Sequence, residues 1–242
     1  MVYVTSDLHG FPLDKFKYFL GKIGFCKDDY LYILGDVIDR GSDGVQLLQW
    51  IMGEPNVELI LGNHEAMMLA CRFMFEDKTD ALKSSLTEAE CEFLRFNWIE
   101  NDGDVTRNAL NELKAEEGGE EKIRDIFDFL WDAPWYDVVS VNGKDYILTH
   151  GGLGNFRKDK KMSEYTLDEL TWERPDINDR YFNDMTVVFG HTPTIYYRRE
   201  YLGKVLKTDT WIDVDVGVGI GQDPVLFRLD DEKCLYYKYE VK

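Results

Sequence analysis

The fold of this chain is decided by the stretch YLYILGDVIDRG, which spans residues 30–41. It opens with five apolar or aromatic residues, the signature of a short strand buried on both faces. The run stops at Gly35, and the carboxylates of Asp36 and Asp39 follow with the cation Arg40. Ligands of open α/β sheets bind at the carboxyl ends of the strands. The stretch therefore predicts a buried strand that ends in chemistry-bearing residues.

Four other stretches repeat this pattern of a short apolar run followed by polar residues. They are residues 2–4 before Asp7 and His9, residues 57–61 before Asn63 and His64, residues 146–148 before His150, and residues 187–189 before His191. Helical apolar spacing over residues 13–23 and 45–52 separates the first three strands. Strands that alternate with helices in this way predict βαβ units and an α/β fold.

Residues 66–132 interrupt the alternation. They are polar, rich in Glu, Leu and Phe, and carry helical spacing, which predicts two to four inserted helices. Strands return over residues 211–218, 225–229 and 235–241, and the turn at residues 229–233 is typical of a closing hairpin. Neither an internal repeat nor a linker is visible. We therefore expect a single domain over residues 1–242 with a helical insertion at about 66–132.

The composition is that of a globular protein with an acidic excess. Hydrophobic residues make up 44%, and 28 Lys and Arg against 46 Asp and Glu give a formal charge of −18. This charge argues against nucleic acid and against an anionic membrane surface as partners. No apolar run approaches the ~20 residues of a membrane span, and MVYVTSDLHG does not resemble a signal peptide. Four scattered cysteines without a CxxC pair favour a reduced, cytoplasmic location.

The chain has only four histidines, and each follows one of the strand-like runs. A single histidine in this position is more often a hydrogen-bonded structural residue, but four equivalent positions indicate a shared site. If the strands share one sheet, the histidines converge on one edge. Imidazole, carboxylate and amide ligands without thiolate suit Mn²⁺, Fe, Zn²⁺ or Ni²⁺. Six such ligands suffice for two metals if one carboxylate bridges, and two metals are the usual means of attacking phosphorus.

Taken in order, these motifs resemble those of the calcineurin-like metallophosphoesterases, and specifically the phosphoprotein phosphatase branch with its bacterial and bacteriophage-type serine/threonine phosphatases. The matching motifs are DxH at residues 7–9, GDxxDRG at 35–41, GNHE at 62–65, HGGL at 150–153 and GH at 190–191. The resemblance implies a four-layer sandwich of mixed β-sheets flanked by helices. GDxxDRG followed by GNHE is a specific signal, whereas DxH or GH alone is weak.

The resemblance also implies two divalent metal ions, with Mn²⁺ expected first and Fe, Zn or Ni as alternatives. The implied ligands are Asp7, His9 and Asp36 for one ion, and Asp36, Asn63, His150 and His191 for the other. It implies that His64 is the general acid and that Asp39 orients its imidazole. Arg40 and Arg174 match the two arginines that bind phosphate.

Two further segments match the family with departures. Trp98-x-x-Asn101-Asp102-Gly103 followed by Thr106 is similar to a bacteriophage-type Trp-x-x-Asn-Gly-Gly-x-x-Thr segment, with Asp102 in place of a glycine. Residues 212–217, IDVDVG, resemble an Ile-Asp-x-Gly strand with two extra residues. Either of its aspartates supports the site or has a structural hydrogen-bonding role.

The function implied is hydrolysis of a phosphomonoester by in-line attack of a metal-bound hydroxide, most readily that of a serine/threonine protein phosphatase. Its partner would be a phosphorylated protein, a peptide or a small phosphoester. One alternative is a dinucleoside-polyphosphate hydrolase, which shares GDxxDRG and GNHE, and a more remote one is a metal-binding regulatory module without turnover. Only two arginines fall in motif positions, and several phosphates would require more cations unless residues 157–161 supply them.

Overall fold

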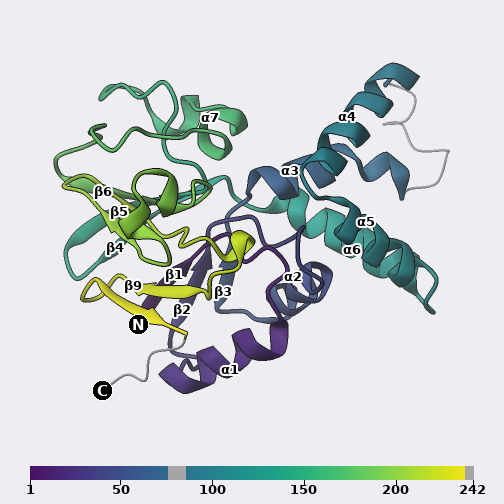
Figure 1. Ribbon diagram of the computed structural model, residues 1–242, viewed down its shortest axis with the longest axis horizontal. Helices are drawn as coiled ribbons and strands as arrows, with labels where there is room; N and C mark the ends of the chain where they lie inside the picture. The colour runs from purple at the N-terminus through teal and green to yellow at the C-terminus, as the bar shows by residue number, and fades with distance from the viewer. Residues whose placement is uncertain (76–85, 238–242) are drawn as a thin grey trace.

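The computed structural model describes residues 1–75 and 86–237, and these form two five-stranded mixed sheets (Figure 1). The first sheet has the order β10-β9-β1-β2-β3, and the second has the order β4-β5-β6-β8-β7. The pairs β1–β2, β2–β3, β5–β6 and β6–β8 are parallel, and the other pairs are antiparallel. The strand bounds are β1 Val2–Thr5, β2 Tyr30–Ile33, β3 Val57–Leu59, β4 Tyr136–Val141, β5 Lys144–Thr149, β6 Met185–Phe189, β7 Leu206–Lys207, β8 Trp211–Asp213, β9 Val225–Arg228 and β10 Lys233–Tyr236.

The helices have local sequence causes. The α-helices are α1 Leu13–Ile23, α2 Gly44–Gly53, α3 Asn63–Ala70, α4 Glu88–Glu100, α5 Asp104–Lys114, α6 Gly119–Asp132 and α7 Leu167–Thr171. Helix α1 buries Phe16, Phe19 and Leu20 and ends at Gly24 in the left-handed conformation. Helix α4 begins with a capping box between Thr87 and Glu90. Within the described part of the chain, no helix has the length and apolar character that spanning a membrane demands.

Three buried clusters show that these elements form four layers. Strand β2 sends Leu31 and Ile33 toward the helices and Tyr32 toward the second sheet, as the two-residue period of a strand requires. Likewise β5 sends Leu148 toward the first sheet and Ile147 to the outer side. On this outer side, Ile147 packs with the segment between β5 and β6, which includes α7. The layers are therefore helices, sheet, sheet, and an outer layer of α7 with long loops.

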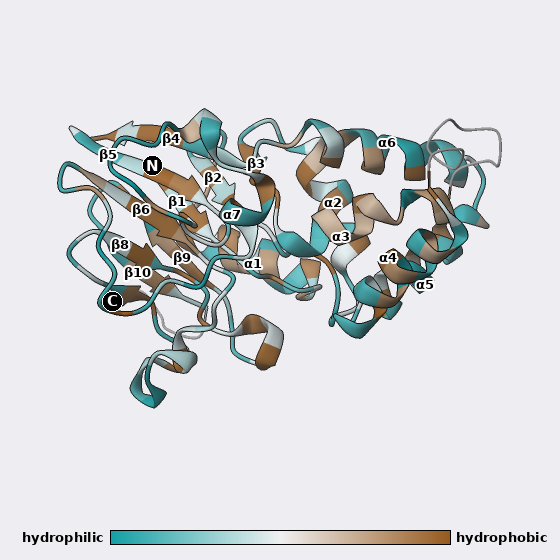
Figure 2. Ribbon diagram, turned by 90° about the horizontal axis from the view of Figure 1, so that it is seen from above, coloured by the Kyte–Doolittle hydropathy of each residue, from teal (hydrophilic) through white to brown (hydrophobic). Residues whose placement is uncertain are grey.

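The helices α4–α6 lie to one side of the two sheets (Figures 1 and 2). Their apolar face belongs to the same buried cluster as the first sheet, because Leu110, Ile126 and Leu130 are grouped there with Ile33 and Leu48. Figure 2 shows hydrophobic residues concentrated in the strands and along the inner faces of these helices. The three helices fall within the predicted insertion, whereas its expected start at residue 66 lies inside α3.

The structure corrects several details of the sequence expectations. The motif-bearing strands do not share one sheet, since β1, β2 and β3 lie in the first and β5 and β6 in the second. The strand expected over residues 211–218 stops at Asp213, because Asp213 Oδ1 accepts a hydrogen bond from Asp215 N at 2.8 Å and turns the chain. The expected hairpin at residues 229–233 joins β9 to β10. Of the strand expected over 235–241, residues 238–241 lie outside the described part.

Candidate metal centre and active site

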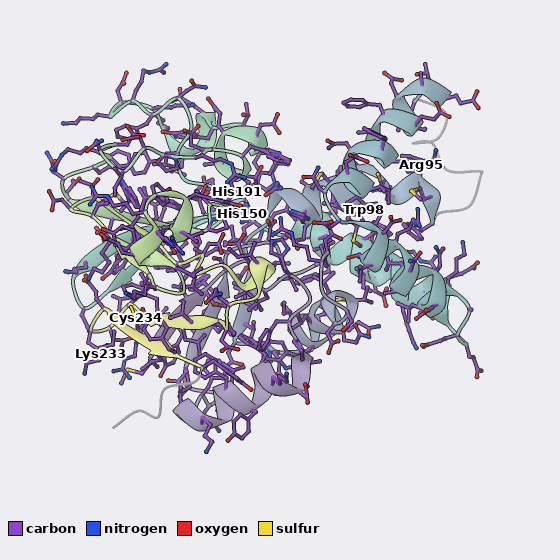
Figure 3. All side chains as sticks on the ribbon, in the orientation of Figure 1. Arg95, Trp98, His150, His191, Lys233 and Cys234 are labelled. Carbon is purple, nitrogen blue, oxygen red and sulfur yellow. The ribbon has the colours of Figure 1, made fainter. Side chains whose placement is uncertain are left out.

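The candidate site lies where strand ends from both sheets meet. Its residues follow the strands or open a helix: Asp7 and His9 after β1, Asp36 after β2, Asn63 and His64 at the start of α3, His150 after β5 and His191 after β6. All seven side chains are buried. Gly190 N donates to His150 O at 2.8 Å, which ties the ends of β5 and β6 together. The labelled His150 and His191 lie side by side in Figure 3, with ring centroids 5.1 Å apart.

The backbone at these strand ends adopts conformations that most residues avoid. Asp7, His9, Asp36 and His191 have positive φ angles between 41° and 66°. This left-handed region is tolerated best by glycine and by short polar residues. It turns each chain sharply, so that the polar side chains converge. The close approach of residue 62 to Asp36 requires glycine, because a Cβ atom at Gly62 would lie 2.4 Å from Asp36 Oδ1.

Two groups of potential ligand atoms share Asp36. Atoms of His9, Asp36 and His64 lie within 4.8 Å of one another, and so do atoms of Asp36, His150 and His191. Asp7 adjoins the first group, with Oδ1 3.9 Å from His9 Nε2. Asn63 adjoins the second, with Oδ1 2.8 Å from His150 Nε2. The structure thus brings the six predicted ligands together, with Asp36 common to both groups.

The imidazoles are oriented as metal ligands require. The Nδ1 atoms of His9 and His150 donate to the carbonyl oxygens of Ile38 (3.0 Å) and Leu34 (2.6 Å), because a carbonyl can only accept. This leaves each Nε2 directed into the cluster. His191 Nε2 is buried and has no hydrogen-bond partner. A buried ring nitrogen without a partner, beside two buried carboxylates, fits a divalent cation.

Burial and charge act on these groups in opposite directions. Burial lowers the pKa of His9 to about 3 and that of His191 to about 2, so both rings are neutral. Burial also raises the pKa of Asp7 to about 6. For His150 burial opposes the charged form, but Asp36 outweighs it and raises the pKa of His150 to about 10. The carboxylates of Asp36 and Asp7 thus attract positive charge, which is here a proton on His150 and which bound divalent ions would supply in its place.

His64 differs from the other three histidines in its partner. Its Nδ1 donates to Asp39 Oδ2 at 2.7 Å, and its Nε2 lies 3.7 Å from Asp36 Oδ2. Burial opposes protonation, but the carboxylates of Asp36 and Asp39 together hold the pKa of His64 above its usual value. The Nε2 position suits either ligation or proton donation, and the Asp39 contact favours the donor. The structure therefore brings His64 and Asp39 into contact, and their roles as general acid and orienting carboxylate stay predictions.

The site opens into a cavity of about 330 Å³, and the two predicted phosphate-binding arginines line it. Arg40 Nε lies 3.6 Å from Asp102 Oδ2, and an Arg174 terminal nitrogen donates to Thr192 Oγ1 at 3.1 Å. The rings of Trp172 and Tyr196, which are 39% and 70% exposed, also line the cavity. None of residues 157–161 is among the residues that line it, and Lys160 pairs with Glu169 at 2.7 Å.

One part of the cavity wall escaped the sequence analysis. The 3₁₀ turn Val218–Ile220 places Gly219 against the site, where a Cβ atom would lie 2.3 Å from an Arg40 guanidinium nitrogen and 2.6 Å from His9 Cδ2. The alternating glycines at 217, 219 and 221 were the available signal. Asp215 Oδ1 accepts from Gly217 N at 2.9 Å and shapes this turn. Burial raises the pKa values of Asp213 and Asp215 well above the usual range, and each accepts a hydrogen bond from the backbone N–H two residues further along the chain.

Comparison with known proteins finds relatives that match part of this chain in sequence. The symmetrical bis(5'-nucleosyl)-tetraphosphatase of Buchnera aphidicola subsp. Acyrthosiphon pisum (strain Tuc7) is 34% identical over 77 residues, 31% of this chain and 28% of that protein. The match thus spans less than a third of the relative's length.

Two solved structures share the fold. A putative diadenosine tetraphosphatase has a TM-score of 0.64 at 16% identity, over 97% of this chain and 91% of that one. The cold-active protein-tyrosine phosphatase of a psychrophilic Shewanella has a TM-score of 0.54 at 17% identity, over 98% and 80%. The sequence pattern of the calcineurin-like phosphoesterases matches residues 1–216, and this chain therefore belongs to the calcineurin-like phosphoesterase family.

Proposed function

We propose that the protein hydrolyses a dinucleoside polyphosphate in the cavity beside the His and Asp cluster. The observation that carries this choice is the curated relative, which is named a symmetrical bis(5'-nucleosyl)-tetraphosphatase. The cavity wall offers a second argument. Trp172 and Tyr196 expose flat rings there, and stacking of a base on such a ring stabilises a complex by about 1–3 kcal/mol. These rings line the same cavity as the two arginines, so a base attached to a phosphate bound there has a ring to stack on.

The donor set described above fits two divalent ions, held by Asp7, His9 and Asp36 on one side and by Asp36, Asn63, His150 and His191 on the other. When bound, such ions supply Lewis acidity toward phosphoryl oxygens and an acidified water. The identity of the metal is part of the proposal, with Mn²⁺ first.

The arginines and His64 supply the remaining steps. Arg40 and Arg174 lie on the wall of the same cavity and carry the positive charge that a phosphoryl group in the transition state requires. His64 lines the cavity, and its Nδ1 donates to Asp39 Oδ2. It is placed to protonate the leaving oxygen, a step that contributes typically ~10²–10⁴-fold for a basic leaving group and less for a nucleoside diphosphate, which is a weaker base.

A second candidate, a phosphomonoesterase acting on phosphorylated proteins or small phosphoesters, is favoured by the charge of the cavity. Arg40 and Arg174 are its only Lys or Arg among the described lining residues, and Asp102 lies beside Arg40. Two arginines and two ions suit one phosphoryl group, and the described lining residues offer no further Lys or Arg to contact the other phosphates of a chain of four. The fold itself does not discriminate, because neighbours at 16% and 17% identity share only the architecture.

A substrate panel with Mn²⁺-reconstituted protein tests the two candidates. We expect diadenosine tetraphosphate, which symmetric hydrolysis splits into two molecules of ADP, to give a kcat/KM at least about tenfold above that of phosphoserine peptides, a step of about 1.4 kcal/mol. The reverse order promotes the phosphomonoesterase. If no substrate is turned over faster than by a His64→Asn control, the remaining candidate is a metal-binding module without catalysis.

A further inference from the structure

The helical insertion reaches the active site through Asp39. The carboxylate of Asp39 is fully buried and accepts three side-chain hydrogen bonds. His64 Nδ1 and Trp98 Nε1 donate to Oδ2 at 2.7 and 3.1 Å, and Thr106 Oγ1 donates to Oδ1 at 2.5 Å. Trp98 belongs to α4 and Thr106 to α5. Two of the three donors to this carboxylate therefore come from the insertion.

We propose that Trp98 and Thr106 are positioning residues that fix the Asp39 carboxylate and, through it, direct the His64 imidazole into the cavity. The inference rests on the proposed proton-donating role of His64. It gives the insertion a part in the hydrolytic step, in addition to its contribution to the hydrophobic core.

The contacts of Thr106 fix both the backbone and the side chain of residue 39. Its Oγ1 accepts from Asp39 N at 2.9 Å while it donates to the carboxylate of the same residue. Asp39 needs such support because its φ angle of 68° lies in the left-handed region. Trp98 Nε1 donates to the Oδ2 atom, which also accepts from His64 Nδ1. Donors on both oxygens define the plane of the carboxylate, which otherwise turns freely about its last torsion.

The turn between α4 and α5 is built to hold these two donors. At Gly103 a Cβ atom would lie 2.5 Å from Trp98 Nε1, so only glycine lets the backbone approach the indole this closely. The preceding residue, Asp102, accepts a hydrogen bond from Arg40 N at 3.4 Å. The turn thus contacts both Asp39 and its neighbour Arg40. Figure 3 shows Trp98 on α4, across from the labelled His150 and His191.

Conservative variants distinguish a positioning role of Trp98 and Thr106 from a purely structural one. Trp98→Phe keeps an aromatic ring and removes the N–H, and Thr106→Val keeps the shape and removes the hydroxyl. Thr106→Ser restores the hydroxyl and is the rescue. Trp211→Phe is the matched control, because Trp211 is equally buried and its Nε1 donates to Asp179 O, away from the residues that line the cavity.

The experiment compares kcat on phenyl phosphate, whose leaving group needs a proton, with kcat on 4-nitrophenyl phosphate, whose leaving group hardly does. We expect Thr106→Val and Trp98→Phe each to lower kcat on phenyl phosphate roughly tenfold, a fraction of the full contribution of a general acid. Their KM, metal content and rate on 4-nitrophenyl phosphate should remain near wild type. Thr106→Ser and Trp211→Phe should behave as wild type on both substrates.

Double variants sharpen the test. In a His64→Asn background, Thr106→Val should cost nothing further, because residues that act through one group are not additive. Equal slowing on both substrates, loss of metal, or an additional loss in the His64→Asn background would overturn the proposal.

A second measurement separates failure of this inference from failure of the proposed function. The proton on His64 Nδ1, observed by NMR of ¹⁵N-histidine-labelled protein, should shift or broaden in Trp98→Phe and Thr106→Val but not in Trp211→Phe. An unchanged resonance in both variants contradicts the positioning role even if the wild type is active. A changed resonance in a protein that hydrolyses no substrate supports the positioning role and rejects the function.

Discussion

The strand-end loops and the α4–α5 turn contribute to the same cavity by different means. The loops present Asp7, His9 and Asp36 within a few residues of the strands that carry them, and neighbouring strands hold them in register. The helices on either side of the turn instead bring Trp98 and Thr106 to the carboxylate of Asp39. That residue lies 59 and 67 positions earlier in the chain. Local sequence thus sets which chemistry is available, whereas long-range contacts set how its groups are oriented.

The two regions also differ in how they are buried. The strand ends lie between two sheets with buried clusters on both sides. Helix α4, by contrast, exposes the rings of Phe93 and Phe96 to 68% and 62% and buries Trp98. A change at the strand ends is therefore expected to affect metal binding, and a change in the insertion to affect orientation and stability.

Asp36→Asn should have the largest effect, because Asp36 belongs to both ligand groups. Asparagine tolerates the positive φ of 53° at this position, so the change removes charge with little backbone strain. We expect loss of bound metal, loss of turnover and a lower melting temperature. Each ion at a hundred times its Kd stabilises by about 2.7 kcal/mol. Metal analysis and thermal unfolding measure this, and full turnover by chelator-treated wild-type protein would contradict the metal requirement.

His64→Asn should separate proton transfer from metal binding. We expect both ions to remain and kcat to fall ~10²–10⁴-fold on poor leaving groups, with a smaller loss on 4-nitrophenyl phosphate. The comparison with Asp36→Asn is made by metal analysis on the same preparations. If His64→Asn also loses a metal, then the first ligand group includes His64 and the strand ends hold no separate acid.

Ile126→Ala in α6 and Ile33→Ala in β2 compare the regions through stability. Both side chains are fully buried in the same cluster. Each truncation should lower the free energy of unfolding by about 2–5 kcal/mol, and urea unfolding should remain a single transition for both variants. A separate early transition in Ile126→Ala alone would show that the insertion folds independently, against the single-domain prediction.

Glu232→Gln should have the smallest effect and serves as a reference away from both regions. Burial opposes ionisation of Glu232, yet hydrogen bonds from Lys144 and Lys207 hold its pKa at about 2. Because the pKa of Glu232 is lowered in the folded state, its ionised carboxylate stabilises the fold at pH values above the ordinary pKa of 4.5. This contribution is lost as the pH falls toward 2. We expect a loss of at most ~1 kcal/mol at pH 7. Urea unfolding should show this difference vanish near pH 2, whereas a constant difference would exclude the ionic cause.

The sequence predicted those features whose causes are local. Helix 13–23, the strands before each motif and the α/β class with its family are confirmed, because apolar periodicity and motif spacing are read within one segment. The candidate ligands Asp7, Asp36 and His150 could be named for the same reason. Their roles stay predictions, although the structure brings them together.

Features that depend on distant contacts could not be predicted. The division of the strands between two sheets follows from the packing of Tyr32 and Leu34 against Tyr146 and Leu148, and no periodicity in the sequence encodes that choice. The donors to Asp39 are another case, since a Trp and a Thr in a helical segment do not indicate a buried carboxylate as their partner. Gly219 is a third, because its contact with Arg40 joins residues 179 positions apart in the chain.

The left-handed backbone around the cavity carries a lesson for engineering. Among the described residues, ten that are not glycine have positive φ, and seven of them are Asp7, His9, Asp36, Asp39, Arg40, Asp102 and His191. Such conformations cost of order 1–3 kcal/mol each. At Asp39 and Arg40, which lie outside the proposed ligand set, glycine would relieve this strain without loss of a metal and would remove groups on which hydrolysis is proposed to depend. Directed evolution for heat resistance without selection for turnover should therefore erode this site first, so activity has to be screened in every round.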